Sequence, residues 1–310
     1  MNKFIVTTTI HKPTNAIHRY RQMEGWTLIV IGDLKTPHDS YRDLENVIYL
    51  SPDDQEHRYS KLSHLIGWNT IQRRNIGFLI AAEMKADIVA TVDDDNIPLY
   101  NWGKDIWLGK TVHNISSYAV DNQICFDPIS VTNYPNLWHR GFPVQLLEKR
   151  QYTLAYEKTT FDIQANFWNG DPDVDAICRI MYRPVCEFNE EIFPFTTSVT
   201  FSPFNSQNTI LTRNAIKDYF VFPQTGRMDD IWASYYMEAL GYRVIYDVPT
   251  VKQDRNDHDL MEDFVKETNG YHLNLKLLQD LSISANNIEK YLTKDSYVAF
   301  IEYKRCMEKF

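Results

Sequence analysis

The sequence has little that would support a disulfide frame or a structural zinc site. Its four cysteines are far apart, and none forms a Cys-x-x-Cys pair: Cys125, Cys178, Cys186 and Cys306. Structural zinc sites usually show closely spaced cysteines, and secreted disulfide-bonded domains are small and rich in cysteine. We therefore expect reduced, mostly buried thiols in a cytoplasmic protein.

Long apolar runs are also missing. No stretch of the 310 residues approaches the roughly 20 consecutive apolar residues that a membrane-spanning helix needs. The N-terminal run MNKFIVTTTIHKP is too short for a signal peptide and has no small-residue cleavage site. We expect no transmembrane segment, which leaves peripheral association as the route to a membrane surface.

Basic residues are not in excess. The 32 Lys and Arg are outnumbered by 41 Asp and Glu, which gives a net charge of −9. Nucleic-acid binders usually carry a basic patch, so this balance argues against a nucleic-acid partner. An anionic substrate stays open, because a bound metal ion can supply positive charge. Aromatic residues form 14% of the chain, which suits a cleft that stacks bases or sugar rings and equally suits an ordinary core.

Apolar, β-branched runs alternate with helical patterns in the first hundred residues. We expect strands at 3–10, 26–33, 47–50 and 88–92, with helices at 14–23 and 68–84. This alternation predicts an α/β fold with a mostly parallel central sheet flanked by helices. Further on we expect a helix at 229–240, a strand at 242–246 and helices at 258–268 and 284–310. We see no repeat or linker and expect one domain over 1–310.

Residues 89–98 read VATVDDDNIP, an apolar run that ends in three consecutive carboxylates. One interpretation is a solvated turn, because Asp and Asn bond their own backbone and end strands at little cost. The other is a cation site at the carboxyl end of a strand, where α/β sheets bind ligands and where oxygen ligands suit a hard divalent cation. The stretch alone favours the turn, so the choice depends on the other motifs.

Polar motifs at the other strand ends favour the cation site. A threonine cluster ends the first expected strand, an aspartate ends the second, and RRNIG opens the helix before the fourth. This order resembles the nucleotide-binding half of the GT-A glycosyltransferases, a Rossmann-like fold in which a DxD motif holds the ribose and a divalent metal. The resemblance implies nucleotide contacts from Thr7, Thr8, Thr9, Asp33, Arg74, Asn75, Asp93 and Asp94.

Longer segments are similar to two families in particular. Residues 73–96 resemble the plant reversibly glycosylated polypeptides, which are UDP-arabinopyranose mutases. RGFP at 140–143, GDPDVDA at 170–176 and GRMDDIWA at 226–233 resemble further motifs of that family, in the same order. RNDH at 255–258 resembles the STELLO-type glycosyltransferases, which share this plan. Several ordered motifs are more specific than any one of them.

The resemblance also implies how the single domain is divided. The motifs cover roughly residues 3–260. We expect a nucleotide-binding half at 1–100, an acceptor and sugar half at 101–260, and a C-terminal helical extension at 261–310.

The DxD motif maps onto Asp93 and Asp95. The resemblance implies Asp95 as the direct ligand of Mn²⁺ or Mg²⁺ and Asp93 as the residue that binds the ribose, the metal or a metal-bound water. Alternate residues of an extended segment point to opposite sides, so we expect Asp94 to be structural, with Arg73 or Arg74 as its partner.

A third metal ligand is expected late in the chain. GT-A enzymes often contribute a histidine, which maps onto His258, with Asp254, Asp257 and Asp259 as nearby alternatives. The competing interpretation is a surface histidine in a polar run.

Asp229 and Asp230 begin the helix expected at 229–240. Carboxylates at a helix N-terminus gain from the helix dipole, so a capping role is one interpretation. The other divides the pair: one caps the helix and its neighbour faces the cleft as a general base. Two adjacent carboxylates repel, which raises the pKa of one of them. We name Asp230 ahead of Asp229 as the base.

Arg140 also has two interpretations. In the mutase family the arginine of this motif is associated with self-glycosylation, whereas the planar fork of an arginine also suits a diphosphate. Residues 171–175, Trp168 and Trp232 either shape a sugar pocket or belong to the core.

The sequence therefore predicts an enzyme. The leading hypothesis is a metal-dependent glycosyltransferase that uses a nucleotide sugar, with UDP as the nucleotide, and a glycan or lipid-linked acceptor in the synthesis of a surface polysaccharide or glycoconjugate. The alternatives are a nucleotide-sugar mutase that interconverts pyranose and furanose forms, and a non-catalytic protein that binds sugar nucleotides.

Overall fold

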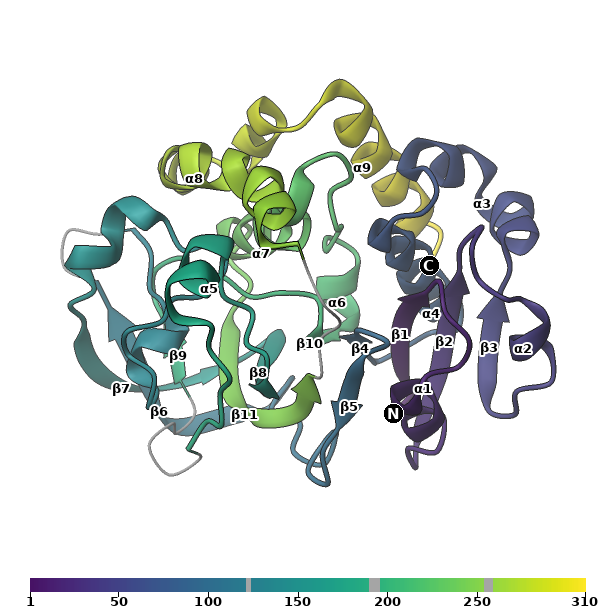
Figure 1. Cartoon of the computed structure of the whole chain (residues 1–310), viewed down its shortest axis with the longest axis horizontal. Coiled ribbons are helices and arrows are strands. Elements are labelled where there is room, and N and C mark those ends of the chain that lie inside the picture. Colours follow the sequence, from purple (N-terminus) through teal and green to yellow (C-terminus); the bar gives the residue numbers. More distant parts are fainter. Residues whose placement is uncertain (121–123, 190–195, 254–258) are drawn as a thin grey trace.

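The computed structural model describes residues 1–120, 124–189, 196–253 and 259–310. In this part of the chain one central sheet has the strand order β3-β2-β1-β4-β10-β8-β11-β9-β6-β7, and β5 pairs with β11 off that path. Figure 1 shows the N-terminal strands at one end of the molecule, the later strands at the other, and the C-terminal helices lying over both.

The N-terminal half is built on four parallel strands: β1 (Lys3–Thr9), β2 (Trp26–Gly32), β3 (Val47–Leu50) and β4 (Ile88–Val92). β1 pairs with β2 and β4, and β2 pairs with β3. All five residues of β4 are buried, as expected for a strand covered on both faces. The carboxyl ends of these strands share one edge of the sheet, where ligands bind in α/β folds.

Helices connect these strands: α1 (Asn15–Tyr20), α2 (Asp39–Arg42), α3 (Pro52–Ile66), η1 (Ile71–Arg73) and α4 (Arg74–Glu83). A capping box between Ser51 and Asp54 begins α3. Gly77 lets α4 lie close to the sheet, because a Cβ there would come within 2.4 Å of Cγ1 of Val6. The sequence between β3 and β4 therefore specifies both where the helices begin and how tightly α4 packs.

The second half contributes β5 (Asn96–Pro98), β6 (Thr111–Ala119), β7 (Thr153–Thr160), β8 (Ile163–Gly170), β9 (Thr196–Ser198), β10 (Asn208–Thr212) and β11 (Val244–Gln253). β10 is antiparallel to both β4 and β8, whereas β8 and β11 are parallel. The predicted α/β class is confirmed. The sheet is parallel through the first four strands and mixed beyond them, because β10 enters between β4 and β8 in the reverse direction.

The remaining helices are α5 (Ala176–Tyr182), α6 (Arg213–Ile216), α7 (Asp229–Ala239), α8 (Leu260–Ile283) and α9 (Lys294–Met307). Short 3₁₀ helices are η2 (Pro128–Val131), η3 (Val144–Lys149), η4 (Gly226–Met228) and η5 (Ala285–Tyr291). α8 is much longer than the helix expected at 258–268. The helix expected at 284–310 is divided into η5 and α9.

The C-terminal helices join the two halves. α9 packs against α3 and α4, and Nζ of Lys61 lies 2.8 Å from a carboxylate oxygen of Glu302. The hydroxyl of Tyr303 donates to the carbonyl of Ile216 at 2.6 Å. The segment predicted as an extension is thus packed into the molecule and covers the top of the sheet in Figure 1.

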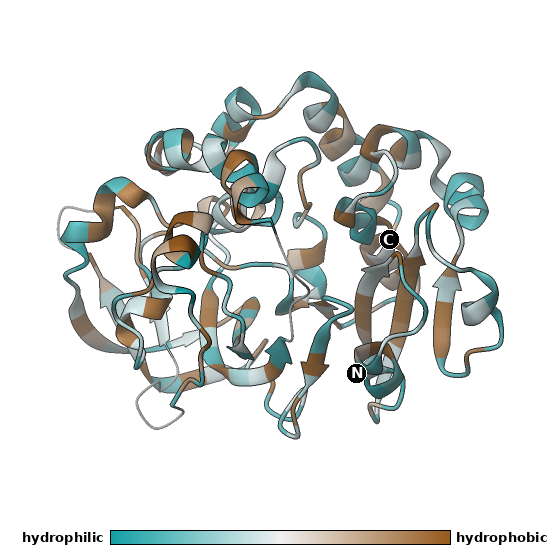
Figure 2. Ribbon diagram, viewed as in Figure 1, coloured by the Kyte–Doolittle hydropathy of each residue, from teal (hydrophilic) through white to brown (hydrophobic). Residues whose placement is uncertain are grey.

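Hydropathy follows these layers. In Figure 2 the N-terminal strands are largely hydrophobic and the outer helix α3 is mostly hydrophilic. No helix in the described part of the chain is long and apolar enough to cross a membrane.

Candidate functional site

A cavity of about 670 Å³ opens at the carboxyl edge of the sheet, between the acidic turn after β4 and the N-termini of η1, α7 and α8. A smaller hollow of about 170 Å³ lies beside it and is lined by Thr8, Thr9 and Asp33. Asn69 and Thr70 line both. The two hollows therefore adjoin at the loop before η1, one toward the ends of β1 and β2 and the other toward the start of α7.

The three carboxylates after β4 form a turn that also faces the cavity. The backbone N–H of Asn96 donates to the carbonyl of Asp93 at 3.3 Å, which closes the turn between β4 and β5. Asp93 and Asp95 both line the cavity. The two interpretations of this stretch are therefore compatible, because the turn itself directs two carboxylates into the same space.

Asp94 is held on the other side of the turn. Its carboxylate accepts a 2.5 Å hydrogen bond from the hydroxyl of Thr9, and its carbonyl accepts one of 2.5 Å from Thr14. Burial raises the pKa of Asp94. The structural role expected for Asp94 agrees with these contacts, but the expected arginine partner was wrong.

Arg73 and Arg74 have other partners. Arg73 donates to Gln55 and Ser63, away from the acidic turn. Arg74 is only 1% exposed and donates to Oδ1 of Asp93 at 2.6 Å and to the carbonyl of Ser206 at 2.6 Å. Burial opposes its charge, but Asp93 and Asp230 together outweigh burial and raise the pKa of Arg74. Arg74 therefore positions Asp93 and does not itself line the cavity.

The predicted nucleoside contacts are divided between the groove and the core. Thr8 and Thr9 line the smaller hollow, whereas Thr7 is fully buried. The carboxylate of Asp33 accepts hydrogen bonds from the backbone N–H groups of Asn69 at 2.8 Å and Thr70 at 3.0 Å. Asp33 therefore shapes the loop before η1, which forms the wall shared by the two hollows.

Asn75 has a structural role instead of the predicted nucleotide contact. Its amide nitrogen donates to the carbonyl of Val221 at 2.9 Å, and its amide oxygen accepts from the N–H of Val221 at 2.9 Å. Asn75 is fully buried. The sequence pattern could not distinguish this role, because the partner lies 146 residues away.

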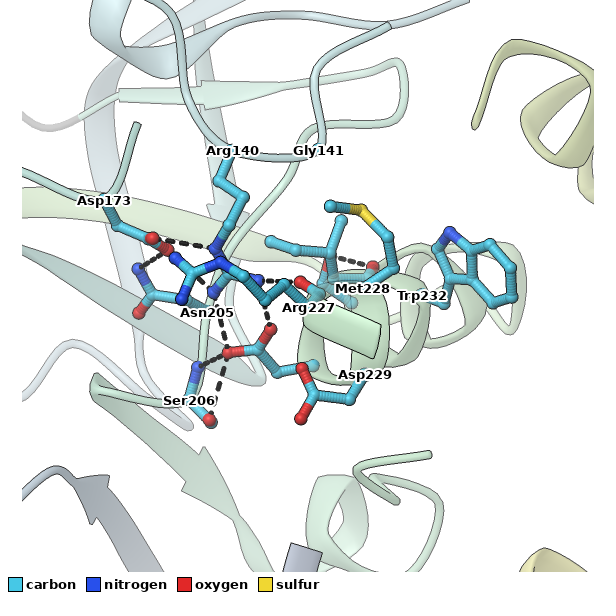
Figure 3. Close-up of polar contacts among 12 residues, drawn as sticks. Arg140, Gly141, Asp173, Asn205, Ser206, Arg227, Met228, Asp229 and Trp232 are labelled. Carbon is cyan, nitrogen blue, oxygen red and sulfur yellow. Dashed lines mark hydrogen bonds and ion pairs between the residues drawn. The ribbon is translucent and has the colours of Figure 1, made fainter. Parts of the chain in front are cut away.

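Arg140 is enclosed by two carboxylates. Its guanidinium donates to Asp173 from Nε at 2.7 Å and from Nη2 at 2.9 Å, and to Asp230 from Nη1 at 3.0 Å and from Nη2 at 3.2 Å. Nη1 also donates to the carbonyl of Arg227. Figure 3 shows Asp173, Asn205 and Ser206 gathered beside Arg140. These five bonds use all five N–H groups of an arginine, so a diphosphate clamp or self-glycosylation would require this network to open.

Asp229 and Asp230 have opposite environments. Burial opposes the charge on Asp230, but Arg140 outweighs burial and lowers its pKa. Burial and the neighbouring Asp230 raise the pKa of Asp229 to about 7. Asp229 accepts a 2.5 Å hydrogen bond from the amide of Gln72. In Figure 3 it lies beside the group of side chains that surround Arg140. The geometry favours Asp229 over Asp230 as the base, the reverse of the order expected from the sequence.

At two positions in the sequence motifs, the backbone conformation and a close contact require a glycine. Gly141 has a φ of +94°, and a Cβ there would lie 2.2 Å from Cγ2 of Ile231 on α7. Gly226 has a φ of +67°, and a Cβ there would lie 2.2 Å from the carbonyl oxygen of Lys266 on α8. Both motifs therefore bring the chain into close contact with the helices that carry the cavity walls.

The expected third metal ligand cannot be placed. His258, Asp254 and Asp257 lie outside the described residues. Asp259 is described: it caps α8 through the N–H of Met261 at 2.9 Å and also lines the cavity.

The segment at 171–175 and the two tryptophans are mostly structural. Asp171 pairs with Arg179, and Asp175 caps α5 and accepts a 2.6 Å hydrogen bond from the indole of Trp138. Trp232 donates to Asn274 at 2.8 Å, and neither Trp168 nor Trp232 lines the cavity in the part of the chain that is described. The core interpretation fits both tryptophans.

Sequence reasoning missed the segment 205–207, which connects the functional groups. The side chain of Asn205 donates to Asp173 at 2.8 Å. The N–H of Ser206 donates to Asp230 at 2.9 Å. The carbonyl of Gln207 accepts from the N–H of Asp93 at 3.3 Å. Nothing in the local pattern FNSQN indicates this role, because each contact depends on a different distant element.

The cavity is acidic for a site that would hold a diphosphate. Among the described residues that line it, the basic groups are Arg140, Arg227 and Lys266. All N–H groups of Arg140 already donate hydrogen bonds within the protein. Arg227 pairs with Asp263 and Glu267, and Lys266 pairs with Glu262. The side chains of the acidic turn offer the oxygen ligands that a hard divalent cation prefers. The described residues contain no group of three or more His, Cys, Asp or Glu side chains that could hold a metal ion. Asp93 and Asp95 would suit a divalent cation that takes its other ligands from substrate phosphates, and such a cation would add positive charge to this acidic wall.

No family model matches the chain. The chain is 25% identical over 278 residues to "Probable glycosyltransferase STELLO1" and 26% identical to "Probable glycosyltransferase STELLO2", both from Arabidopsis thaliana. Each alignment covers 82% of this chain and 36% of the relative, so the chain spans little more than a third of the length of these curated relatives.

Among solved structures, the chain is similar to glucosyl-3-phosphoglycerate synthase from Mycobacterium tuberculosis in complex with Mn²⁺, UDP and phosphoglyceric acid. The TM-score is 0.46 and the identity 12%, over 94% of this chain and 80% of that one. The predicted resemblance to the STELLO-type glycosyltransferases is confirmed by the two curated relatives. The resemblance to the reversibly glycosylated polypeptides stays a prediction.

Proposed function

We propose that this protein is a metal-dependent glycosyltransferase of the GT-A type that uses a nucleotide sugar, with UDP as the nucleotide. The observation that supports this most directly is that the acidic turn and Asp229 face one cavity. The first can bind a cation, and the second has a pKa suited to taking a proton at neutral pH. The names of the curated relatives agree with this activity.

Asp93 and Asp95 are the residues that would hold the cation, with His258 as a further expected ligand. A bound Mn²⁺ or Mg²⁺ would neutralise negative charge that develops on the departing diphosphate. Arg74 holds Asp93 at 2.6 Å, and the bond between Thr9 and Asp94 holds the rest of the turn. Both anchors keep the two cavity-facing carboxylates in place before a ligand arrives.

Asp229 is the general base in this proposal. Its pKa of about 7 allows it to take the proton of an acceptor hydroxyl as the new glycosidic bond forms. Gln72 donates to Oδ2 of Asp229, which fixes the orientation of the carboxylate. Asp230 stays ionised beside Arg140, and its negative charge raises the proton affinity of the Asp229 carboxylate.

Calorimetric titration with UDP tests the proposal. We expect UDP to bind in the presence of Mn²⁺ and to lose most of its affinity in EDTA. The absence of metal-dependent binding at millimolar UDP would exclude a UDP-dependent enzyme. The acceptor class, a glycan or lipid-linked molecule in surface polysaccharide or glycoconjugate synthesis, and the cytoplasmic location remain parts of the same proposal.

Two tests separate the alternatives. A nucleotide-sugar mutase would convert UDP-arabinose or UDP-galactose to its furanose form without an acceptor, and product chromatography would show it. A non-catalytic binding protein would bind UDP and show no turnover that depends on Asp229. The enclosed guanidinium of Arg140 makes the transferase our preferred function over the mutase.

A further inference from the structure

Gln207 and Gln253 form a buried amide pair in the wall of the main cavity. Gln207 precedes β10 and Gln253 ends β11, and the two side chains are 4% and 3% exposed. Nε2 of Gln207 donates to Oε1 of Gln253 at 3.0 Å. Both residues line the cavity that contains Asp95 and Asp229.

The pair has hydrogen-bonding capacity left over. In the part of the chain that the structure describes, the only side-chain bond of either amide is the one between them. An amide carries one acceptor oxygen and two N–H donors. Oε1 of Gln207 and Nε2 of Gln253 are thus an acceptor and a donor without protein partners, at the edge of a cavity. Neither atom is among the fully buried side-chain atoms that lack a partner, so both are open to the cavity, where a ligand can reach them.

The backbone places this pair between the two carboxylate groups of the site. The carbonyl of Gln207 accepts from the N–H of Asp93 at 3.3 Å and from the side chain of Asn96 at 2.9 Å. The N–H of the preceding Ser206 donates to Asp230 at 2.9 Å. A sugar whose diphosphate lies at the acidic turn, and whose reacting carbon faces Asp229, would have to pass beside these amides.

We propose that Gln207 and Gln253 bind hydroxyl groups of the transferred sugar, and that the donor carries a neutral, hydroxyl-bearing sugar. A hydroxyl donates to Oε1 of Gln207 and accepts from Nε2 of Gln253, so it satisfies both free positions. The carboxylate of a uronic acid is acceptor-only, and it would face the acceptor oxygen of Gln207 within an acidic cavity. This inference rests on the proposed function and specifies its donor.

Calorimetry with four ligands tests the inference. UDP, UDP-glucose, UDP-galactose and UDP-glucuronate are titrated with Mn²⁺ into the full chain, and the Kd of each UDP-sugar is divided by the Kd of UDP. The variants are Gln207→Ala and Gln253→Ala, and Gln207→Met, which keeps side-chain bulk. The backbone bonds of both residues do not depend on their side chains, so the acidic turn should be retained.

We expect the variants to bind UDP as the wild type does and to raise the ratio for the preferred neutral sugar about 5- to 20-fold, the loss of one or two hydrogen bonds. The double variant should lose little more than either single one, because the amides act as a pair. Gln224→Ala is the control. It removes a glutamine that lines the same cavity but already accepts from Thr293 at 2.6 Å, and its ratios should not change.

Three results would overturn the inference: unchanged ratios for all three sugars, an equal loss of UDP affinity in the variants, or tighter binding of UDP-glucuronate than of both neutral donors. A wild type that does not bind UDP with Mn²⁺ would instead reject the proposed function itself. The two failures are therefore distinguishable in one data set.

Discussion

The cavity contains two runs of adjacent carboxylates, and they are held in different ways. The acidic turn 93–95 follows a strand, and its first carboxylate, a third exposed, pairs with Arg74. The pair 229–230 begins a helix, and its second carboxylate pairs with Arg140 where both side chains are less than a tenth exposed. In each run one arginine fixes one carboxylate and a neighbouring carboxylate faces the cavity.

The difference between the runs indicates a difference in chemistry. In the turn, Asp93 is a third exposed, and its carboxylate oxygens are of the kind that a hard cation prefers as ligands. Burial at the helix raises the pKa of Asp229, which suits proton transfer. In the proposed function the same residue type would bind a metal in one wall and act as a base in the other, and burial together with the nearest charges separates the two roles.

Replacing Asp229 should have the largest effect. Asp229→Asn removes the proposed base while keeping its shape, so we expect turnover to fall on the order of 10³-fold, with UDP binding in Mn²⁺ unchanged. Kinetics with the active donor and acceptor measure the first effect and calorimetry the second. Glu262→Gln is the control, because Glu262 lines the same cavity and pairs with Lys266 on its own helix. Equal turnover in the two variants would contradict the assignment.

Replacing each of the two arginines in turn should show how much the two arginine–carboxylate pairs differ in burial. Arg140→Met leaves Asp173 and Asp230 buried without a cation, which should lower the free energy of unfolding by about 3–5 kcal/mol. Arg74→Met releases a carboxylate that is a third exposed, and should lower it by about 1–3 kcal/mol. Urea unfolding of both variants provides the values. An equal loss would show that the two ion pairs are equally buried in solution.

Asp95→Asn should weaken metal-assisted UDP binding on the order of 100-fold, at the upper end of what altered metal-site residues cost. Without metal the change should be neutral or slightly stabilising, because it reduces repulsion within the turn. Melting temperatures in EDTA, and then in Mn²⁺ with UDP, separate the two effects. Asp94→Asn is the matched control, because it removes one charge from the same turn while its side-chain oxygen can still accept the hydrogen bond from Thr9. If Asp95→Asn gains as much from Mn²⁺ and UDP as the wild type, the carboxylates form only a turn.

The smallest effect per step of the experiment, here one pH unit, should appear in the pH dependence of stability. Burial and the neighbouring Asp230 raise the folded-state pKa of Asp229 to about 7 from its ordinary value of 3.8. Between these values the folded protein holds a proton that the unfolded chain has lost, so stability falls as pH rises, by at most about 1.4 kcal/mol per pH unit. Unfolding curves from pH 4 to 8 should therefore be flatter for Asp229→Asn. Parallel curves would mean that Asp229 is ionised throughout this range.

The N-terminal half was the part that the sequence predicted best. The strands expected at 26–33, 47–50 and 88–92 match β2, β3 and β4 to within a residue at either end. These strands are continuous apolar runs bounded by polar residues, and such patterns are local. The position of β10 was not predictable in the same way. Its neighbours β4 and β8 are chosen by long-range pairing, which leaves no local mark.

The same division applies to the site. The carboxylates at 93–95 and 229–230 and the strand-end threonines were candidates because polar residues at the ends of apolar elements stand out, whereas Arg140 was a candidate only through the resemblance to a known family. The sequence could not predict that Asn75 bonds Val221, that Arg74 bonds Asp93, or that segment 205–207 contacts both carboxylate runs of the cavity. Each of these contacts joins segments that are remote in sequence or that face one another only after folding.

The amino-acid sequence by itself determined which elements form and which polar side chains stand at their ends, because strand and helix formation follow from the spacing of apolar residues along a short stretch. Only the tertiary structure decided the protonation and the role of each carboxylate. Asp229 and Asp230 are adjacent and chemically identical, yet Arg140 reaches one and not the other. A pKa depends on burial and on charges a few ångströms away in space, and those distances exist only once the chain is folded.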